Sequence, residues 1–184
     1  MSVFIATWKG NQLDLLNPDP ELVTIEEIAE SLSREGRFHN KTSIHYSVAQ
    51  HCVEVSQLCK TWEGQIWGLL HDASDAYHRD LATNLKNHPL LQGFWRHMER
   101  MWLEMFAEKW SLTLPMPPEV KQADRVMLAV ERRMLLPDTP EVTAQFKFNE
   151  EGLNVPTRVL MVWSQLEAKL RYVSTFNKLM KLRP

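Results

Sequence analysis

A histidine followed directly by an aspartate, His71-Asp72, ends an apolar stretch of the sequence. An imidazole nitrogen and a carboxylate oxygen are both ligands that divalent transition metals accept. His51 precedes this pair and Asp124 follows it. We predict that these four side chains bind one divalent metal ion.

Two nitrogen and two oxygen ligands suit Zn, Mn, Fe, Co or Ni, and an octahedral ion with fewer than six protein ligands keeps positions for water and substrate. Such a cation polarises a phosphoryl oxygen and lowers the pKa of a bound water, so that hydroxide is available near neutral pH. A triphosphate substrate would bring additional Mg. The predicted chemistry is metal-assisted attack by water.

Each ligand also has an ordinary structural explanation. A single histidine on a helix is usually a polar core or surface group, and Asp124 has a residue type common on solvated helix faces. The metal site is the stronger hypothesis because the three segments that carry these residues match a metal-binding pattern together and in order.

Helical periodicity predicts the elements that carry the first three ligands. Apolar residues recur at helical spacing from Tyr46 to about Lys60, and a second run extends from about Gln65 to Tyr77. His51 therefore lies within one helix, and His71 and Asp72 lie at the inner end of the next.

A third helix is predicted to carry Asp124. It runs from Glu119 to about Leu136, with Pro118 suited to its first turn. Pro137 and Pro140 end it, and a loop rich in polar residues is predicted to follow. Three such helices packed together can bring the four ligands to one point.

The N-terminal part of the chain predicts a different local structure. Residues 1 to 23 are expected to be extended or hairpin-like. Thr24 and Glu27 fit a capping box, in which each side chain binds a free backbone N–H of the other. The helix that they open should pass through Leu32 and end near Gly36.

Two further helices complete the prediction. Pro89 is expected to start a long amphipathic helix with a wide apolar stripe from Phe94 to about Trp110. Pro156 is expected to open a last helix through Leu170. With no internal repeat, the pattern predicts an all-α fold of about six or seven helices in one compact domain, residues 1 to 184.

Composition excludes several other classes of protein. With 184 residues, 44% of them hydrophobic, the chain can bury one sizeable core. The net charge of -2, from 21 basic and 23 acidic residues, argues against binding to long nucleic acid. Two cysteines, Cys52 and Cys59, provide no disulfide scaffold and favour a reducing, cytoplasmic location. Neither a signal peptide nor a membrane-spanning stretch is recognisable, so we expect a soluble, unprocessed protein.

A resemblance to a known family rests on three segments, residues 46 to 51, 70 to 75 and 120 to 125. In order and residue type they resemble the H…HD…D signature of the HD-domain metal-dependent phosphohydrolases. Residues 37 to 38, 71 to 77, 80 to 81 and 118 to 125, with Lys86 and Glu131, look like the 5'-deoxynucleotidase branch, which includes phage dATP triphosphohydrolases. The resemblance covers about residues 21 to 137 and implies an HD-domain fold.

The resemblance implies roles in substrate binding for four residues. Arg37 corresponds to an arginine that holds substrate phosphate, and Lys86 to a lysine close to the phosphate. Phe38 is expected to face the sugar or base, and Asp80 to lie near the sugar hydroxyl, which together would favour deoxyribose. The ordinary alternatives are surface cations for Arg37 and Lys86, a core position for Phe38 and a helix cap for Asp80.

Asp75 stands where the family pattern more often has glutamate. By resemblance this residue is the general acid or base, and it shares the catalytic assignment with His71 and Asp72. Aspartate has one methylene fewer, so its carboxylate reaches about 1.5 Å less far. A misplaced catalytic group can cost much of the rate.

We therefore expect a hydrolase that acts on a small deoxyribonucleotide. A triphosphohydrolase would release deoxynucleoside and triphosphate from a dNTP, and a 5'-deoxynucleotidase would remove phosphate from a dNMP. Two other readings are a nucleotide-binding regulator that has lost turnover through Asp75, and an interaction module in which the motif is coincidental. The wide apolar stripe from Phe94 to Trp110 also predicts a homo-oligomer.

Overall fold

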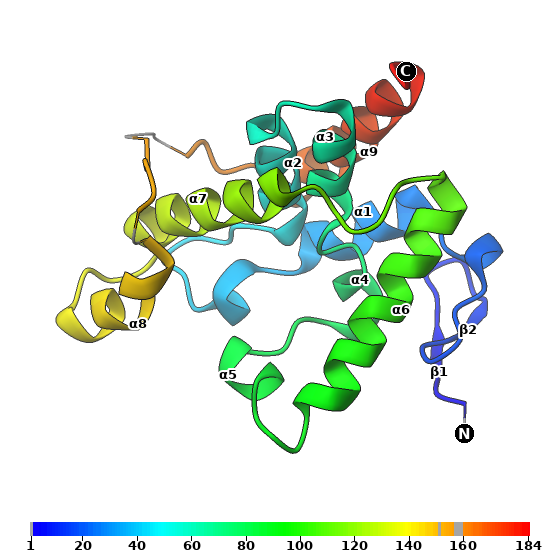
Figure 1. Cartoon of the computed structure of the whole chain (residues 1–184), viewed down its shortest axis with the longest axis horizontal. Coiled ribbons are helices and arrows are strands. Elements are labelled where there is room, and N and C mark those ends of the chain that lie inside the picture. The colour runs from blue at the N-terminus through cyan, green and yellow to red at the C-terminus, as the bar shows by residue number, and fades with distance from the viewer. Residues whose placement is uncertain (1, 151, 157–159) are drawn as a thin grey trace.

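The computed structural model describes residues 2 to 150, 152 to 156 and 160 to 184, and its architecture is almost entirely helical (Figure 1). The longer helices are α1 (Ile25–Arg34), α2 (Val48–Leu58), α3 (Trp62–Leu70), α6 (Gln92–Trp110), α7 (Pro118–Leu135), α8 (Pro140–Glu150) and α9 (Gln165–Lys181). Shorter elements are β1 (Phe4–Ala6), β2 (Gln12–Asp14), η1 (Pro20–Leu22), η2 (Arg37–Asn40), α4 (Asp75–His78) and α5 (Thr83–Lys86). The predicted all-α fold is confirmed.

The N-terminal segment forms a small antiparallel hairpin, as predicted. Strands β1 and β2 pair with Ile5 opposite Leu13, and the turn between them contains Gly10 at φ 84°. Leu13 is fully buried. The indole Nε1–H of Trp102 in α6 donates to the carbonyl of Leu15 at 3.2 Å, which ties the hairpin to the helices.

Helix α1 begins directly after Thr24, as predicted, but the capping box is wrong. The Thr24 hydroxyl makes no cap hydrogen bond, and the Glu27 carboxylate accepts the backbone N–H of Trp8 at 2.6 Å. The Glu27 carboxylate, which the local sequence places within reach of the helix start, binds the hairpin instead. The helix ends at Arg34, close to the predicted end.

Helix α2 lies at the centre of the fold. It packs against α1, α3, α7 and α9, and its residues from Val48 to Ser56 are all buried. Helix α3 approaches closely at Gly68, where an added Cβ would lie 2.9 Å from the Cα of Ser56. Because α2 is packed on several sides, a side chain on it is held firmly in place.

The long helix α6 begins at Gln92 rather than at Pro89 and ends at Trp110, as predicted. Trp102 and Phe106 are fully buried, whereas Phe94 at the other end of the stripe is 54% exposed. None of the described helices is long and apolar enough to cross a membrane.

Helix α7 begins at Pro118 and ends at Leu135, which confirms the third predicted helix. The polar loop predicted after it is wrong, because residues 140 to 150 form α8. Proline is compatible with the first helical turn, since its missing N–H has no intrahelical partner there. Pro140 therefore opens a helix rather than prolonging a break.

The last helix also differs from the prediction. It begins at Gln165, after Ser164, whose hydroxyl accepts the N–H of Glu167. Pro156 lies outside any helix, and residues 157 to 159 of the predicted helix fall outside the described part of the chain. The segment before α9 is held to α2 by Gln50, which binds the carbonyl of Met161 at 2.8 Å and the N–H of Trp163 at 2.9 Å.

Candidate metal centre

Three helices position the four predicted ligands. His51 lies within α2, His71 directly follows α3, Asp72 lies in the turn after it, and Asp124 lies on α7. Helices α2, α3 and α7 pack against one another, and Figure 1 shows one end of α7 close to the other two. The convergence expected from the sequence is therefore present.

The ligand atoms lie within a few ångströms of one another. Nε2 of His51 is 3.3 Å from Nε2 of His71 and 3.2 Å from Oδ1 of Asp124, and Nε2 of His71 is 3.3 Å from Oδ2 of Asp72. Two further separations, His51 to Asp72 and His71 to Asp124, are 3.8 and 3.9 Å.

These separations agree with the geometry of one metal ion. Ligands at about 2.1 Å from an ion lie about 3 Å apart when adjacent and about 4.2 Å apart when opposite. His51, His71 and Asp72 have ligand atoms that all lie within 4.8 Å of one another and form a group that could hold a metal ion. Asp124, which lies on α7, is close to both histidines.

Hydrogen bonds orient both imidazole rings for this task. Nδ1–H of His51 donates to Oε1 of Glu131 at 2.6 Å, and Nδ1–H of His71 donates to the carbonyl of Gly68 at 2.8 Å. With the proton on Nδ1, each Nε2 presents its lone pair to the centre. Metal-binding histidines usually make this second hydrogen bond, so the residues present fit a divalent cation.

Glu131 and Arg37 form a second layer behind the ligands. Glu131 is fully buried, and its Oε2 accepts Nε–H of Arg37 at 3.1 Å. Nη1 of Arg37 also contacts Oδ2 of Asp72 at 3.4 Å. Although burial opposes a charged carboxyl, His51 and Arg37 lower the pKa of Glu131 below its usual value.

Sequence reasoning gave Glu131 no role in the site. A signal was present, because Glu131 follows Asp124 on α7 at the i, i+7 spacing that places two residues on one helix face. A buried carboxylate on the same face as a proposed ligand is a natural partner for that ligand or its neighbours.

The carboxylates dominate the electrostatics of the centre. Burial opposes an imidazolium at His71, yet the Asp72 carboxylate raises the pKa of His71 to about 9. The pKa of Asp72 is in turn lowered, despite its burial, chiefly by His71. The negative carboxylates that favour a proton on the His71 imidazole also favour a divalent cation at the same place. Because a metal ion and a proton compete for the same nitrogen, metal binding should release protons.

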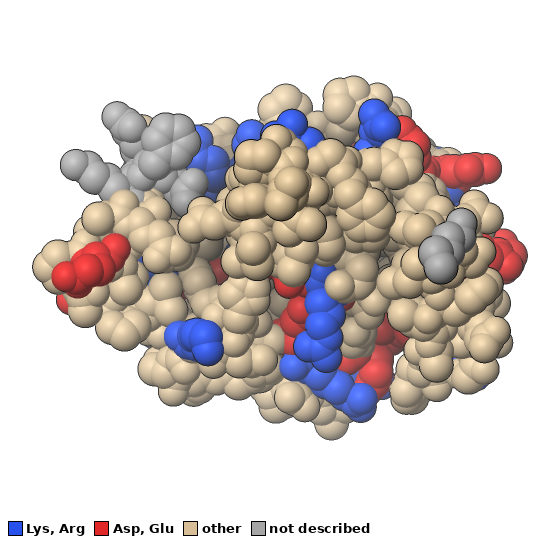
Figure 2. Space-filling model, turned by 90° about the horizontal axis from the view of Figure 1, so that it is seen from below, with Lys and Arg blue, Asp and Glu red and all other residues tan. Residues whose placement is uncertain are grey.

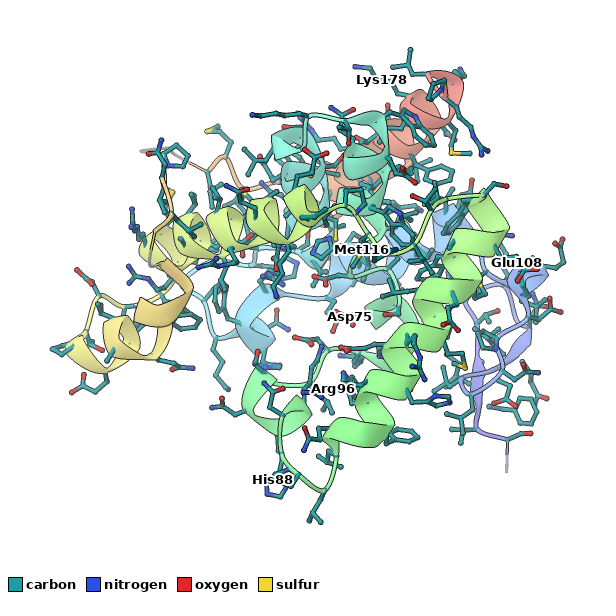
Figure 3. The ribbon with its side chains drawn as sticks, viewed as in Figure 1. Asp75, His88, Arg96, Glu108, Met116 and Lys178 are labelled. Atoms are coloured by element: carbon teal, nitrogen blue, oxygen red, sulfur yellow. The ribbon has the colours of Figure 1, made fainter. Side chains whose placement is uncertain are left out.

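Asp75 lies at the start of α4 and near the centre of the molecule (Figure 3). It is 7% exposed and lines a small hollow of about 190 Å³ together with Arg37, Arg79 and Asp80. Burial, with the nearby carboxylates of Asp72 and Asp80, raises its pKa well above the usual value. Asp75 therefore tends to hold a proton where an ordinary aspartate has lost it.

Arg37 and Phe38 belong to η2, whose backbone has an unusual conformation. Phe38, His39 and Asn40 have φ values of 53°, 53° and 59°, in the left-handed region that residues with a Cβ avoid. Each such residue costs about 1–2 kcal/mol, and this kind of strain is concentrated at functional sites. The turn carries the Arg37 and Phe38 side chains to the pocket wall.

Lys86 and Asp80 lie next to each other and form an ion pair. Nζ of Lys86 is 2.8 Å from Asp80 and 3.0 Å from Glu99, and it lies over the ring of Trp95. Glu99 also accepts the indole N–H of Trp95 at 2.9 Å. Lys86 and Asp80 were predicted to contact different parts of a substrate, and their spacing in the sequence did not indicate that they pair with each other.

A pocket of about 600 Å³ adjoins the metal centre. It is lined by both ligand carboxylates, Asp72 and Asp124, and by all four predicted substrate-binding residues: Arg37, Phe38, Asp80 and Lys86. Seen from below, acidic and basic side chains gather near the middle of this face (Figure 2). Helix α8 adds Val142, Gln145 and Phe146, which the sequence analysis missed because it expected a loop there.

A larger groove of about 750 Å³ lies elsewhere, along α9. Its lining includes Lys169, Leu170 and Val173 and none of the predicted site residues. The largest of these hollows therefore does not coincide with the converging His and Asp side chains.

Comparison with known proteins adds a relationship but no activity. No protein-family model matches the chain. It is 36% identical over 85 residues to the uncharacterized protein RCAP_rcc00048 of Rhodobacter capsulatus, covering 42% of this chain and 43% of that protein. It is 41% identical over 134 residues to the uncharacterized protein YfdR of Escherichia coli K12, covering 72% of each chain. This chain belongs to the same protein family as Escherichia coli YfdR.

Proposed function

We propose that the protein is an HD-domain, metal-dependent phosphohydrolase that acts on deoxyribonucleotides. The observation that carries this proposal is the convergence of two imidazole Nε2 atoms on two carboxylates, Asp72 and Asp124, that line a pocket together with Arg37 and Lys86. Metal ligands and phosphate-binding cations facing one cavity are the combination that phosphoester hydrolysis requires.

His51, His71, Asp72 and Asp124 would hold one divalent cation such as Zn, Mn or Co. When bound, it would polarise a phosphoryl oxygen and supply hydroxide near neutral pH. Glu131 orients His51 and keeps its proton on Nδ1. Asp75, whose raised pKa favours the protonated carboxyl, would donate that proton to the leaving oxygen.

Arg37 would bind the substrate phosphate through its outer nitrogens. Glu131 holds Nε of the guanidinium, while the contact from Nη1 to Asp72 is longer, at 3.4 Å, and more easily exchanged. A phosphate oxygen would take over this second contact and gain a charge-assisted hydrogen bond. Lys86 would contribute a second positive charge from the α5 side.

Within this class we favour a deoxynucleoside triphosphate as substrate, released as deoxynucleoside and triphosphate. Three basic side chains line the pocket, those of Arg37, Lys41 and Lys86, together with three carboxylates, those of Asp72, Asp80 and Asp124. With a divalent cation bound at Asp72 and Asp124, the pocket would carry a surplus of positive charge for more than one phosphate. A 5'-deoxynucleotidase is the alternative, since it would use the same metal and water on a monophosphate.

Product analysis tests this proposal. The protein, loaded with Mn, Co, Zn or Mg, is incubated with each dNTP, each dNMP and their ribose counterparts, and products are separated by anion-exchange chromatography. Deoxynucleoside with triphosphate establishes the triphosphohydrolase, and deoxynucleoside with orthophosphate establishes the nucleotidase. The double variant His71→Ala/Asp72→Ala is the matched control and should be inactive.

One observation favours a second candidate, a nucleotide-binding regulator without turnover. Asp75 has a shorter side chain than the glutamate of the resembled pattern. Under this hypothesis the wild type binds nucleotide stoichiometrically, no substrate is cleaved, and Asp75→Glu does not restore cleavage. Turnover in either form would reject the regulator.

A further inference from the structure

The pocket beside the metal centre has two chemically different ends. Near the start of α7 it is lined by Asp124, with Asp72 and Arg37 close by. Further along α7 and onto α8 the lining becomes apolar: Leu128, Leu136, Pro137, Val142 and Phe146. At about 1.5 Å per residue, the helix separates Asp124 from Leu136 by roughly 18 Å. A ligand that spans the pocket would need an anionic end and an apolar end.

Two aromatic rings mark the border of the apolar end. The rings of Phe38 and Phe146 meet edge to face, with centroids 6.0 Å apart, and both residues are only partly buried. The left-handed turn fixes Phe38 directly beside Arg37, whose guanidinium carbon lies 5.9 Å from the ring centroid. A flat heteroaromatic ring could stack here while its phosphate contacts Arg37.

Helix α8 also contributes the amide of Gln145 to the lining. An amide side chain offers both a hydrogen-bond donor and an acceptor. Such a group can bind the polar edge of a ring that is held by apolar neighbours. Gln145 is exposed, so its amide is available to the polar edge of a nucleobase, whereas an aliphatic or lipid ligand would make no use of it.

We propose that Leu136, Val142, Gln145 and Phe146, with Phe38 opposite, form a nucleobase subsite, here called the α8 wall. This inference rests on the proposed nucleotide substrate and extends it, because it makes α8 the element that selects the base. Phosphate binding and metal chemistry stay at the other end of the pocket.

The experiment distinguishes binding of the base from binding of the phosphate. Binding and hydrolysis are measured for deoxynucleoside monophosphates, deoxynucleoside triphosphates and 2-deoxyribose 5-phosphate, which lacks a base, using the Mn-loaded full chain. The variant Phe146→Ala removes the aromatic face. Thr143→Ala is the matched control, because Thr143 lies on the same helix, is exposed and does not line the pocket.

The subsite predicts a selective loss. Phe146→Ala should weaken nucleotide binding about tenfold, the range expected for one stacking partner, and change binding of the base-free sugar phosphate less than twofold. Gln145→Leu should reduce the differences in affinity among the four bases. Equal effects on both ligand classes, or wild-type affinity for nucleotides no higher than for 2-deoxyribose 5-phosphate, would overturn the proposal.

The design also separates this inference from the proposed hydrolase. Selective loss of binding without hydrolysis of any substrate would support the α8 wall and reject the enzyme. Hydrolysis that is equally affected for both ligand classes would support the enzyme and reject the α8 wall. Circular dichroism of each variant checks that α8 and the rest of the fold remain intact.

Discussion

Glu131 lies outside the candidate ligand set and contacts two residues of the candidate site. Its two carboxylate oxygens accept hydrogen bonds from His51 and Arg37 at 2.6 and 3.1 Å, so it orients one candidate ligand and the proposed phosphate-binding arginine together. Glu131→Gln should lower metal affinity about 10- to 100-fold, because an amide is a weaker acceptor for the imidazole N–H. Competition with a chromogenic chelator measures this affinity.

The matched control for Glu131 is Glu108→Gln. Glu108 is exposed on α6 and lies away from the pocket (Figure 3), so this variant should retain wild-type affinity. Equal affinity in Glu131→Gln and wild type would mean that Glu131 only stabilises the core.

Asp75 provides a pH-dependent prediction. Burial, together with Asp72 and Asp80, raises its pKa in the folded protein, so folding favours the protonated carboxyl. The stabilising contribution of that proton is present below the pKa of the unfolded chain and is lost as pH rises through the folded pKa. Asp75→Asn should therefore raise Tm at neutral pH, with the difference disappearing in acid, while turnover is lost.

Thermal unfolding in chelator at a series of pH values tests this expectation. Asp138→Asn, at an exposed position after α7, provides the control for a simple loss of one negative charge. A lower Tm for Asp75→Asn at neutral pH would show that the charged carboxylate is stabilised by a partner.

At the level of single residues, the sequence indicated which side chains converge better than it indicated their partners. His51, His71, Asp72 and Asp124 were selected because three segments match a known signature in order, and their side chains do lie close together. The role of Glu131, and the pairing of Lys86 with Asp80 and Glu99, depend on which helices meet. The capping box failed on the Glu27 side because the hairpin's Trp8 N–H binds that carboxylate.

Between elements, Glu119 fixes α7 against the start of α3. Its carboxylate accepts the N–H of Lys60 at 2.8 Å and the N–H and hydroxyl of Thr61. These bonds, the Thr61 hydroxyl first, lower the pKa of Glu119. Because α3 leads to His71 and α7 carries Asp124, this contact helps to set the spacing of the ligands.

Glu119→Gln should weaken this contact in a pH-dependent way. A lowered folded pKa gives stability that is present above the unfolded pKa and is lost as pH falls through the folded value. We expect a loss of about 1 kcal/mol or less at neutral pH, because the carboxylate is largely solvated, and no difference in strong acid. Urea unfolding at neutral pH and in strong acid measures this loss of stability. A difference between variant and wild type that is the same at both pH values would contradict the role given to the Glu119 carboxylate.

Periodicity predicted helices at the three segments that carry the candidate ligands, and the prediction failed at Pro140 and Pro156. Helices α2 and α7 have regular apolar spacing and were located to within two residues. The helix predicted from about Gln65 to Tyr77 is wrong in its bounds, because α3 begins at Trp62 and ends at Leu70 and α4 begins at Asp75 after a turn. Pro140 was expected to end a helix but opens α8, whereas Pro156 was expected to open a helix but lies outside any helix. A proline is compatible both with a helix start and with a break, so only tertiary contacts decide between them.

Across the whole molecule, the candidate site joins parts of the chain that are far apart in sequence. His51 comes from the central helix, His71 and Asp72 from the end of α3, and Asp124 from α7. Helical patterns could predict that these elements exist. They could not predict the pocket, because its apolar wall comes from α8 and its strained turn from η2.

A bound cation would link three helices and should stabilise the entire fold. A ligand that binds only the folded state adds about 2.7 kcal/mol at 100 times its Kd, so a saturating divalent metal should raise Tm by several degrees. Asp124 is the decisive residue, because His51, His71 and Asp72 already form a compact group without it. Asp124→Asn should keep the metal-free Tm within a few degrees of wild type and lose most of the metal-induced rise. A rise as large as that of wild type would show that the cation is held by α2 and α3 alone, and that α7 contributes to the pocket without binding the metal.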